Sequence, residues 1–246
     1  MKNKRDGSPP AETAGKQTAE SGLVSVVLPI FNSERFLAEA IDSVLAQSYR
    51  NLELIVVDDG STDGGAKAAQ GYPVRYFRQE HRGPGAARNF GIRQARGEFL
   101  AFLDSDDLWM PEKTARQTAR LAARPELEAV FGWVEQFAGG PAASQKIRNT
   151  GIIKKGIHPG AMLIRSASFA RIGPFAEDRR IGEFLDWYAR AMEAGLVSGI
   201  LPEVVLRRRI HEDNLMRSRE ADTSEYARIL KAALDRRRSA ENSGDE

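Results

Sequence analysis

The sequence predicts an α/β fold in which helices flank both faces of a mixed, mainly parallel sheet. Between residues 23 and 134, short apolar runs rich in β-branched residues alternate with segments of helical apolar spacing. The runs show no polar alternation, which is typical of parallel strands that are buried on both faces. Strands and helices that alternate in this way favour one sheet with helices on both sides.

Each element of the first half has its own sequence signal. Leu23–Leu28 is a buried strand that Pro29 ends, and Ser33 is a suitable N-cap for the helix that follows. Pro111 takes the position that proline favours in the first turn of a helix. The further strands expected here are Leu54–Val57, Val74–Phe77, Glu98–Leu103 and Glu128–Val134, and the helices are Phe36–Leu45, Gly85–Ala95 and Pro111–Ala123.

The second half is less regular and is expected to form a smaller subregion. Phe137–Gly156 is rich in Gly, Ala and Ser, which indicates a long loop or a hairpin, and Gly195 is placed to end a helix. The elements expected after this segment are a strand over Ala161–Ile164, helices over Ser166–Ile172 and Gly182–Ala194, a strand over Val204–Ile210 and a final helix over Asp222–Arg238.

Composition divides the chain into three parts. Residues 1–22 contain no aliphatic side chain larger than alanine beyond the initial methionine, and they predict a disordered leader. A single domain is expected over residues 23–220, with halves at 23–134 and 135–220. Residues 221–246 are expected to form a C-terminal helix and a polar tail.

Charge and cysteine content exclude several classes of protein. The 246 residues include no cysteine, which excludes a disulfide scaffold, a cysteine zinc site and a thiol nucleophile. Lys and Arg number 36 against 34 Asp and Glu, a near-balance that argues against a nucleic-acid partner. No apolar run approaches the ~20 residues that span a bilayer. No apolar segment follows the basic N-terminus as in a secretory signal, so a cytoplasmic location is expected.

Polar clusters follow three of the predicted strands. They are Pro29–Asn32, Asp58–Asp63 and Asp104–Asp107. Parallel strands bring their carboxyl ends to one edge of the sheet, which is where open α/β sheets bind ligands. Several carboxylates at one edge repel one another unless a cation or hydrogen-bond donors offset their charge.

The spacing of Asp104 and Asp106 suits two carboxylates around a hard divalent cation such as Mg²⁺ or Mn²⁺. Acidic pairs are also common in ordinary turns, and Asp58–Ser61 has the alternative of a plain turn that caps a helix. Gly83–Asn89 resembles a phosphate-binding loop that enters a helix, although it matches neither the dinucleotide fingerprint nor the P-loop.

The motifs together resemble family 2 glycosyltransferases of the Rossmann-like GT-A fold. Four segments carry the resemblance, in the order and spacing of that family: Val24–Asn32, Asp58–Asp63, Gly85–Gly91 and Phe102–Asp107. The match covers residues 23–134 and continues more loosely to Asn214. The resemblance implies that the first half binds a nucleotide sugar and that the second half, 135–220, receives the acceptor.

The resemblance also implies a donor and a metal. The donor in such enzymes is usually UDP-linked, and the metal is Mn²⁺ or Mg²⁺. Asp59 would contact the uracil, Asp104 the ribose or sugar, and Asp106 the metal that bridges the diphosphate. The residues implied for the donor site are Pro29, Phe31, Asn32, Glu34, Asp59, Ser61, Gly85, Arg88, Asn89, Asp104 and Ser105, and those implied for the metal are Asp106, Asp104 and His211.

A general base is implied at the start of a later helix, where the family usually carries Glu-Asp. Glu183 matches the glutamate, but Phe184 stands where the aspartate is expected. Asp186 lies three residues after Glu183 and projects from the same helical face. We therefore predict Asp186 as the base of an inverting displacement, with Glu183 as the next candidate. The structural alternative is that Glu183 is an N-terminal acid favoured by the helix dipole and that Asp186 is its polar neighbour.

The remaining features leave alternatives open. His211 follows a basic run, as in related enzymes, whereas His81 and His158 are expected to be structural or surface residues. The final helix, basic at Arg228 and Lys231, is expected to dock on the domain, with peripheral contact to the inner face of a membrane as the alternative. The acceptor is a glycan, a lipid-linked molecule or a peptide. The alternative function is a catalytically weak module that binds sugar nucleotides or acts as a scaffold.

Overall fold

The structure is a computed structural model that describes residues 19–139, 151–179 and 181–211, together with seven residues of a C-terminal helix: Arg228, Ile229, Lys231, Ala232 and Leu234–Arg236. The elements of the first half are β1 (Glu20–Ile30), α1 (Glu34–Leu45), β2 (Leu52–Asp58), α2 (Gly65–Gln70), β3 (Arg75–Arg78), α3 (Pro84–Gln94), β4 (Gly97–Phe102), β5 (Leu108–Trp109) and α4 (Lys113–Ala123). Those of the second half are β6 (Ala129–Ala138), β7 (Ile153–Gly156), the 3₁₀ turn η1 (Pro159–Ala161), β8 (Leu163–Arg165), α6 (Ser166–Ile172), α7 (Glu183–Glu193) and β9 (Ser198–Ile210).

One sheet organises the described residues. Its strands lie in the order β3-β2-β1-β4-β8-β6-β9-β5, with β7 paired to β6. β1 pairs in parallel with β2 and with β4, so that Val26 lies opposite Leu54 on one side and Ala101 on the other. β8 is antiparallel to both β4 and β6, and β9 is parallel to β6. Six strands (β1, β2, β3, β4, β6 and β9) therefore run in one direction, which confirms the mixed, mainly parallel sheet.

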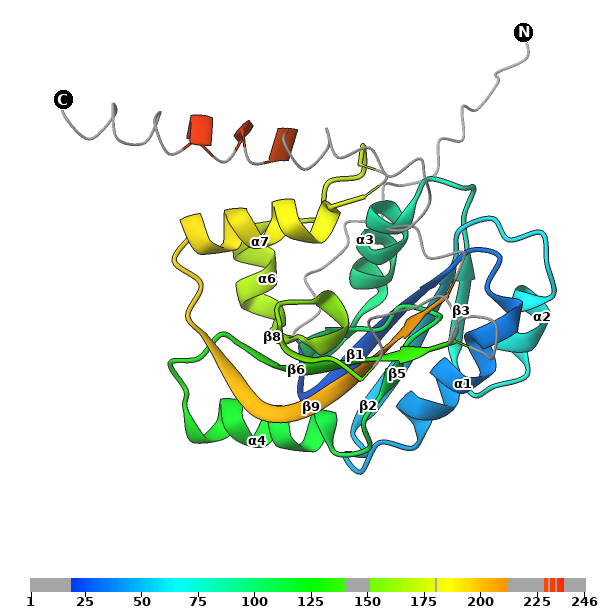
Figure 1. The fold of residues 1–246 in the computed structure, drawn as a ribbon, viewed down its shortest axis with the longest axis horizontal. Helices are drawn as coiled ribbons and strands as arrows, with labels where there is room; N and C mark the ends of the chain where they lie inside the picture. The colour runs from blue at the N-terminus through cyan, green and yellow to red at the C-terminus, as the bar shows by residue number, and fades with distance from the viewer. Residues whose placement is uncertain are drawn as a thin grey trace, which may run out of the picture.

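Helices cover both faces of this sheet (Figure 1). Val24, Val26 and Leu28 of β1 point to the face that α1, α2 and α4 cover. Val27, between them, points to the opposite face, where α6 and α7 pack, and α3 lies on the same side. This alternation follows from the two-residue period of a strand. The apolar β1 run buries both of its faces, as the sequence predicts.

Several predicted boundaries differ from the structure. The strand predicted from Leu23 begins at Glu20, whose N–H donates to the carbonyl of Arg96 at 2.8 Å, so residues 20–22 belong to β1 and not to the leader. The first strand also runs through Pro29 to Ile30. A proline lacks only the backbone N–H donor, and the strand keeps its hydrogen bonds beyond it, since the Asp59 N–H donates to the carbonyl of Ile30 at 2.8 Å. Helix α4 begins at Lys113 and not at Pro111.

Other predictions fall partly outside the described residues. β7 pairs antiparallel with β6, as the hairpin alternative for Phe137–Gly156 predicts. Residues 140–150 of that segment are not among the described residues. The leader lies outside it as far as residue 18, as does most of the predicted helix Asp222–Arg238. Of that helix, Ile229 is buried and Arg236 contacts Glu193 of α7.

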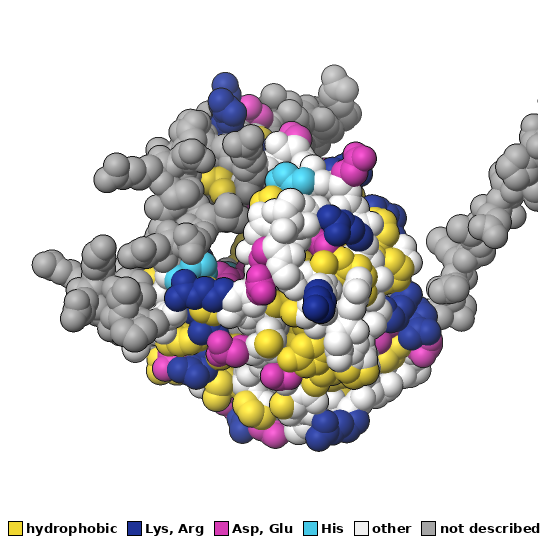
Figure 2. Space-filling model, turned by 90° about the vertical axis from the view of Figure 1, so that its right-hand side faces the viewer, with side chains coloured by type: hydrophobic (Ala, Val, Ile, Leu, Met, Phe, Trp, Pro, Cys, Tyr) yellow, Lys and Arg dark blue, Asp and Glu magenta, His cyan; other side chains and the backbone are white. Residues whose placement is uncertain are grey.

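The surface carries charges of both signs. Figure 2 shows acidic and basic side chains interspersed over one face, in keeping with a formal net charge of +2. Within the described ranges, none of the helices has the length and apolar character that crossing a bilayer requires.

Candidate functional site

The carboxyl ends of β1, β2, β4 and β9 share one edge of the sheet because these strands run in the same direction. The order of strands reverses between β1 and β4, since β2 and β3 lie on one side of β1 and β4 lies on the other. Open α/β sheets bind ligands at such a switch point. The polar clusters that the sequence places after three strands meet here, and the end of β9 brings a fourth group.

The first two clusters hold each other in place. Asn32 adopts a positive φ of 48°, and its backbone N–H donates to Ser61 Oγ at 3.1 Å. Its side-chain oxygen accepts the N–H of Thr62 at 2.9 Å. Glu34 accepts the N–H of Gly64 at 3.0 Å and so ties the start of α1 to the start of α2. Among these predicted site residues, Asn32, Glu34 and Ser61 therefore shape the edge through contacts to loop backbone.

The Asp58-Asp59 pair has two different environments. Asp58 accepts from the Tyr76 hydroxyl at 2.6 Å and from the Ser61 N–H at 2.7 Å. Burial by itself raises the pKa of Asp58, but these hydrogen bonds outweigh it and hold the pKa below its usual value. Asp59 accepts from the N–H groups of Arg82 and Gly83 at 2.9 and 2.8 Å, and thereby fixes the loop that enters α3.

An aromatic pair lies beside Asp59. Phe31, whose side chain is 44% exposed, stacks on His81 with ring centroids 4.0 Å apart. The Nδ1 of His81 lies 2.9 Å from Asp59 Oδ2. His81, expected to be a structural or surface residue, thus contacts two predicted site residues. An exposed pair of flat rings next to a carboxylate has the shape and polarity to receive a nucleobase.

Arg88 connects two motifs that lie far apart in the sequence. Its side chain is buried, and its two terminal nitrogens contact Asp104 and Glu183 at 2.5 Å each. The pKa of Asp104 falls because the attraction of Arg88 outweighs burial, which acts in the opposite direction. Arg88 therefore joins the acidic loop after β4 to the first turn of α7.

Gly85 and Asn89, both predicted near the nucleotide, pack against the segment after α6. The side-chain amide of Asn89 exchanges hydrogen bonds with the backbone of Phe175, at 2.9 and 3.0 Å. A Cβ on Gly85 would collide with the carbonyl of Ala176. The contacts of Gly85 and Asn89 hold α3 in place, whereas Arg88 between them faces the acidic loop.

The acidic loop is attached to the end of β9. His211 Nε2 lies 2.9 Å from Asp106 Oδ2, and the Arg209 N–H donates to Asp107 at 2.8 Å. Burial raises the pKa of Asp107, and the charges of Asp106 and Asp104 raise it further. The Ser105 hydroxyl donates to the Ser33 hydroxyl oxygen, at the start of α1, at 2.7 Å. The structure therefore brings together the predicted metal ligands Asp106 and His211.

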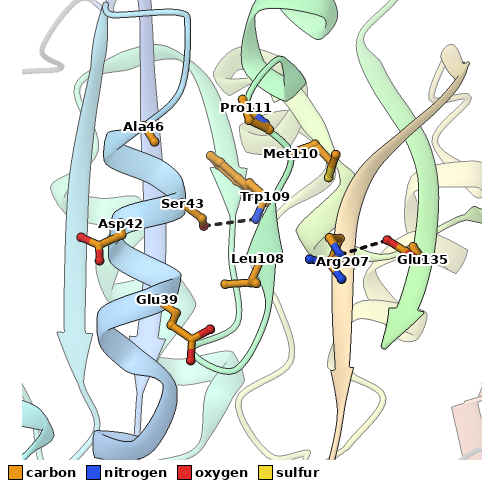
Figure 3. A pocket seen from close by; sticks show the side chains of 10 residues that line it. All are labelled: Glu39, Asp42, Ser43, Ala46, Leu108, Trp109, Met110, Pro111, Glu135 and Arg207. Carbon is orange, nitrogen blue, oxygen red and sulfur yellow. Dashed lines mark hydrogen bonds and ion pairs between the residues drawn. The ribbon is translucent and has the colours of Figure 1, made fainter. Parts of the chain in front are cut away.

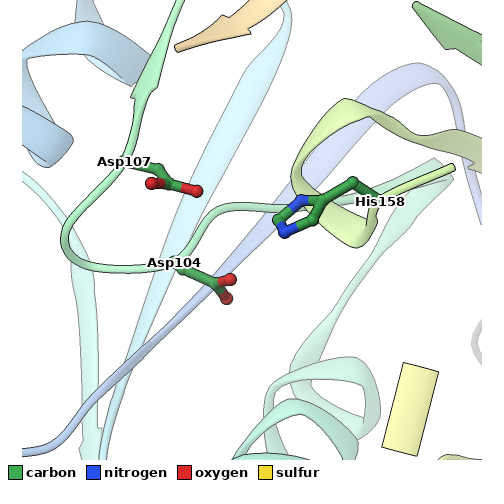
Figure 4. Close-up of side chains that lie close together, drawn as sticks. All are labelled: Asp104, Asp107 and His158. Carbon is green, nitrogen blue, oxygen red and sulfur yellow. The ribbon is translucent and has the colours of Figure 1, made fainter. Parts of the chain in front are cut away.

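A second group of polar side chains surrounds Asp104. One ligand atom each of Asp104, Asp107 and His158 lie within 4.8 Å of one another, an arrangement that could hold a cation, and Figure 4 shows the three side chains converging. The sequence prediction treats His158 as structural or surface. The missing signal was strand direction: because β8 runs antiparallel to β4, the residues before β8 lie at the carboxyl end of β4.

The two predicted bases lie on α7 in contrasting surroundings. Glu183 contacts Arg88, while Asp186 pairs with Arg190 at 3.1 Å and with Arg179 at 3.5 Å. Both carboxylates are buried. Phe184 lies between them in sequence and stacks on Trp187, which belongs to the core. Of these two carboxylates, Glu183 is the one that contacts Arg88, which in turn contacts Asp104 of the acidic loop.

A cavity of about 690 Å³ lies between α1 and the strands β5 and β9, and Figure 3 shows its lining. None of the predicted site residues lines it. Arg207 and Glu135 form an ion pair of 3.0 Å on one wall, and Glu39 and Asp42 project from α1 on the other. This cavity is separate from the group around Asp104.

Comparison with known proteins decides the family. The sequence model of the family described as Glycosyl transferase family 2 matches residues 25–177, more than half of the chain. This chain belongs to glycosyltransferase family 2. A Rickettsia typhi glycosyltransferase, described as uncharacterized, is 29% identical to it over 240 residues, which cover 89% of this chain and 74% of that protein. The putative glycosyltransferase EpsE of Bacillus subtilis is 30% identical over 209 residues, covering 79% and 75%.

A Rickettsia felis glycosyltransferase, described as uncharacterized, is 36% identical over 154 residues. That match covers 61% of this chain but only 24% of the longer relative. Solved structures share the GT-A fold. TarS residues 1–349 of S. aureus, in complex with UDP-GlcNAc, has a TM-score of 0.69 at 20% identity and covers 85% of this chain and 65% of its own. The mannosyltransferase PcManGT of Pyrobaculum calidifontis, in complex with GDP-Man and Mn²⁺, has a TM-score of 0.65 at 21% identity, covering 86% and 64%.

Proposed function

We propose that this family 2 member is an inverting, metal-dependent enzyme that moves a sugar from a nucleotide-diphosphate sugar to an acceptor hydroxyl. The observation that carries the proposal is the meeting of four strand ends at one edge, where Asp106 and His211 lie 2.9 Å apart. The complexes of TarS with UDP-GlcNAc and of PcManGT with GDP-Man support the donor class. We propose a UDP-linked donor because the motif order resembles enzymes that use one.

The residues present fit a divalent metal. A carboxylate oxygen and an imidazole nitrogen that lie side by side are ligands for Mn²⁺ or Mg²⁺, and such a metal takes further oxygens from substrate phosphates. Asp106 and His211 would hold it, and it would offset the charge that grows on the departing diphosphate. One oxygen of Asp104, also predicted as a ligand, contacts Arg88. We therefore propose that Asp104 faces the ribose or the sugar.

The chain's own residues provide the rest of the reaction. Phe31 and His81 receive the nucleobase beside Asp59, which orients it. Arg88 fixes Asp104 and Glu183 relative to each other. An inverting displacement needs a base that removes the acceptor proton on the face opposite the leaving group. Asp186 remains our proposal for that base, with Glu183 as the alternative; the two differ in that Asp186 is paired with two arginines and Glu183 with one.

The direct test measures release of nucleoside diphosphate from UDP-GlcNAc, UDP-glucose and GDP-mannose, with Mn²⁺ or with a chelator. We expect release from one donor, dependent on metal and lost in Asp106→Asn. The exposed Lys155 of β7 provides a control, because Lys155→Ala leaves the site intact. Release of nucleoside diphosphate that persists in the chelator, or in Asp106→Asn, would overturn the proposed metal dependence. Tight binding of UDP without any turnover would favour the alternative of a binding or scaffolding module.

A second comparison separates the two candidate bases. Loss of a general base lowers kcat by about 10²- to 10⁴-fold while leaving donor binding in place. We expect this pattern in Asp186→Asn, with retained Mn²⁺-dependent UDP binding. The same pattern in Glu183→Gln, with Asp186→Asn near wild type, would assign the base to Glu183.

A further inference from the structure

The turn that carries His158 is anchored by buried side chains. The indole N–H of Trp109 donates to the carbonyl of Gly160 at 2.9 Å. The Gln117 amide donates to the carbonyl of Ala161 at 2.8 Å, and the fully buried Lys113 ammonium donates to Met162 at 3.2 Å. These bonds hold the backbone of η1 from behind. Groups that bind ligands precisely are usually supported in this way.

The hydrogen bonds of the turn also define the state of the His158 ring. The Gly160 N–H donates to His158 Nδ1 at 3.1 Å, so Nδ1 is an acceptor. An imidazole whose Nδ1 accepts a hydrogen bond is neutral and carries its proton on Nε2. A protonated Nε2 is a donor and not a metal ligand, so in this state His158 does not complete a cation site with Asp104 and Asp107.

Asp104 and His158 offer complementary open positions. The ion pair with Arg88 uses Oδ1 of Asp104, and within the described residues its Oδ2 accepts no hydrogen bond. In the same part of the chain, Nε2 of His158 donates none. The side chain of Asp104 is 30% exposed, so a ligand can reach it. The open acceptor and the open donor thus belong to two side chains that converge (Figure 4).

The chemistry of this pair selects a hydroxyl group. A hydroxyl oxygen can accept from His158 Nε2 and donate its own proton to Asp104, with both partners satisfied. Two hydrogen bonds of about 2.8 Å to one tetrahedral oxygen place the partner atoms about 4.6 Å apart. One ring nitrogen of His158 and one carboxylate oxygen of Asp104 lie within 4.8 Å of each other, so the two side chains are close enough to share a hydroxyl. A phosphate oxygen only accepts, and the Asp104 carboxylate would repel it.

We propose that His158 and Asp104 together bind one carbohydrate hydroxyl of the donor, so that His158 contributes to recognition of the donor. This inference rests on the proposed function and deepens it. The hydroxyl belongs either to the transferred sugar or to the ribose, which the test distinguishes. A donor that lacks the recognised hydroxyl leaves both partners unpaired, and enzymes discriminate strongly against substrates of that kind.

The test compares donors with and without single hydroxyls. For whichever of UDP-GlcNAc, UDP-glucose and GDP-mannose is turned over, kcat/KM is measured with monodeoxy forms of the sugar and with the 2′- and 3′-deoxyribose forms. The enzymes are the wild type, His158→Ala, His158→Gln and the control Lys155→Ala. Glutamine can present an N–H near the position of Nε2, so it preserves the donor while losing the bond from Gly160.

We expect His158→Ala to lower kcat/KM for the full donor by about 10- to 100-fold, and by less than about 3-fold for one deoxy form. That deoxy form identifies the hydroxyl, and hence whether it is on the sugar or the ribose. His158→Gln should recover part of the loss, and Lys155→Ala should match the wild type.

An equal loss on every donor, without recovery by glutamine, would show that His158 only supports the turn and would overturn the proposal. If the wild type turns over no donor, the proposed transfer fails. The role of His158 is then tested by the Mn²⁺-dependent affinity for the same full and deoxy nucleotides, where His158→Ala should weaken binding of the full donor and spare one deoxy form. Binding that His158→Ala weakens equally for all of them would again overturn it.

Discussion

Loss of Arg88 should destabilise the fold, because its side chain is buried between two carboxylates. Its guanidinium is buried between Glu183, whose side chain is 11% exposed, and Asp104, whose side chain is 30% exposed. Arg88→Met removes the cation and keeps most of the side-chain volume. Removing one partner of a buried ion pair costs about 3–5 kcal/mol because it strands the other charge. The partly exposed Asp104 adds at most about 1 kcal/mol.

We therefore expect Arg88→Met to lower the free energy of unfolding by about 4 kcal/mol, which corresponds to a fall in Tm of about 8–16 °C for a domain of this size. Urea unfolding at pH 7 measures the loss. If the stranded charge causes it, the double variant Arg88→Met/Glu183→Gln should be about 2 kcal/mol more stable than Arg88→Met alone.

A loss below about 1 kcal/mol would contradict this prediction, since it would mean that the two ion pairs contribute no more than exposed pairs do. Equal stability of the single and double variants would also refute it, because the cost would then come from packing and not from the unpaired carboxylate.

Three further predictions follow from buried contacts. Tyr76→Phe should lower the free energy of unfolding by about 1–2 kcal/mol at pH 7, because it removes a hydrogen bond to Asp58. Hydrogen bonds hold the folded pKa of Asp58 down against burial, so the difference is present above about pH 4 and disappears as the pH falls through the folded pKa. Urea unfolding across this pH range measures it. Trp109→Phe should cost about 1–3 kcal/mol in the same assay, because it leaves a buried carbonyl of η1 without its donor. Gly132→Ala should lower Tm, equivalent to about 1–3 kcal/mol, because the new methyl would lie 2.5 Å from Val205; an unchanged Tm would contradict the close packing.

Much of the fold follows from local patterns in the sequence. The strands of the first half are apolar runs that end in turn residues, and their carboxyl ends meet as parallel pairing requires. The acidic clusters could be placed at one edge by this argument alone. The order of β1, β2 and β4 then makes the edge a ligand site.

The rest depends on pairings that local patterns do not encode. β5 has only two residues, too few to show the two-residue alternation of a strand. It is recognised as a strand because it pairs antiparallel with β9. α2 is short and rich in alanine and glycine, so it lacks an apolar stripe. The position of His158 depends on the direction of β8, which a three-residue strand does not reveal.

Side-chain partners were also beyond the sequence. Arg88 lies 95 residues from Glu183, and no spacing rule links them. Asn89 and Gly85 belong to the same motif as Arg88, yet they contact the 175–177 segment, so membership of a motif does not define what each residue touches. Contacts of this kind depend on how α3 and α7 pack, which the complete fold determines.

A calorimetric titration of UDP and GDP against the protein, with and without Mn²⁺, tests the metal–nucleotide site most directly. We predict that one nucleotide binds only with the metal. It should bind about 10- to 100-fold more weakly to His211→Ala, which removes one of two adjacent ligands, while Lys155→Ala should bind as the wild type does. Binding that is indifferent to Mn²⁺ and to His211→Ala would contradict the claim that Asp106 and His211 form a metal–nucleotide site.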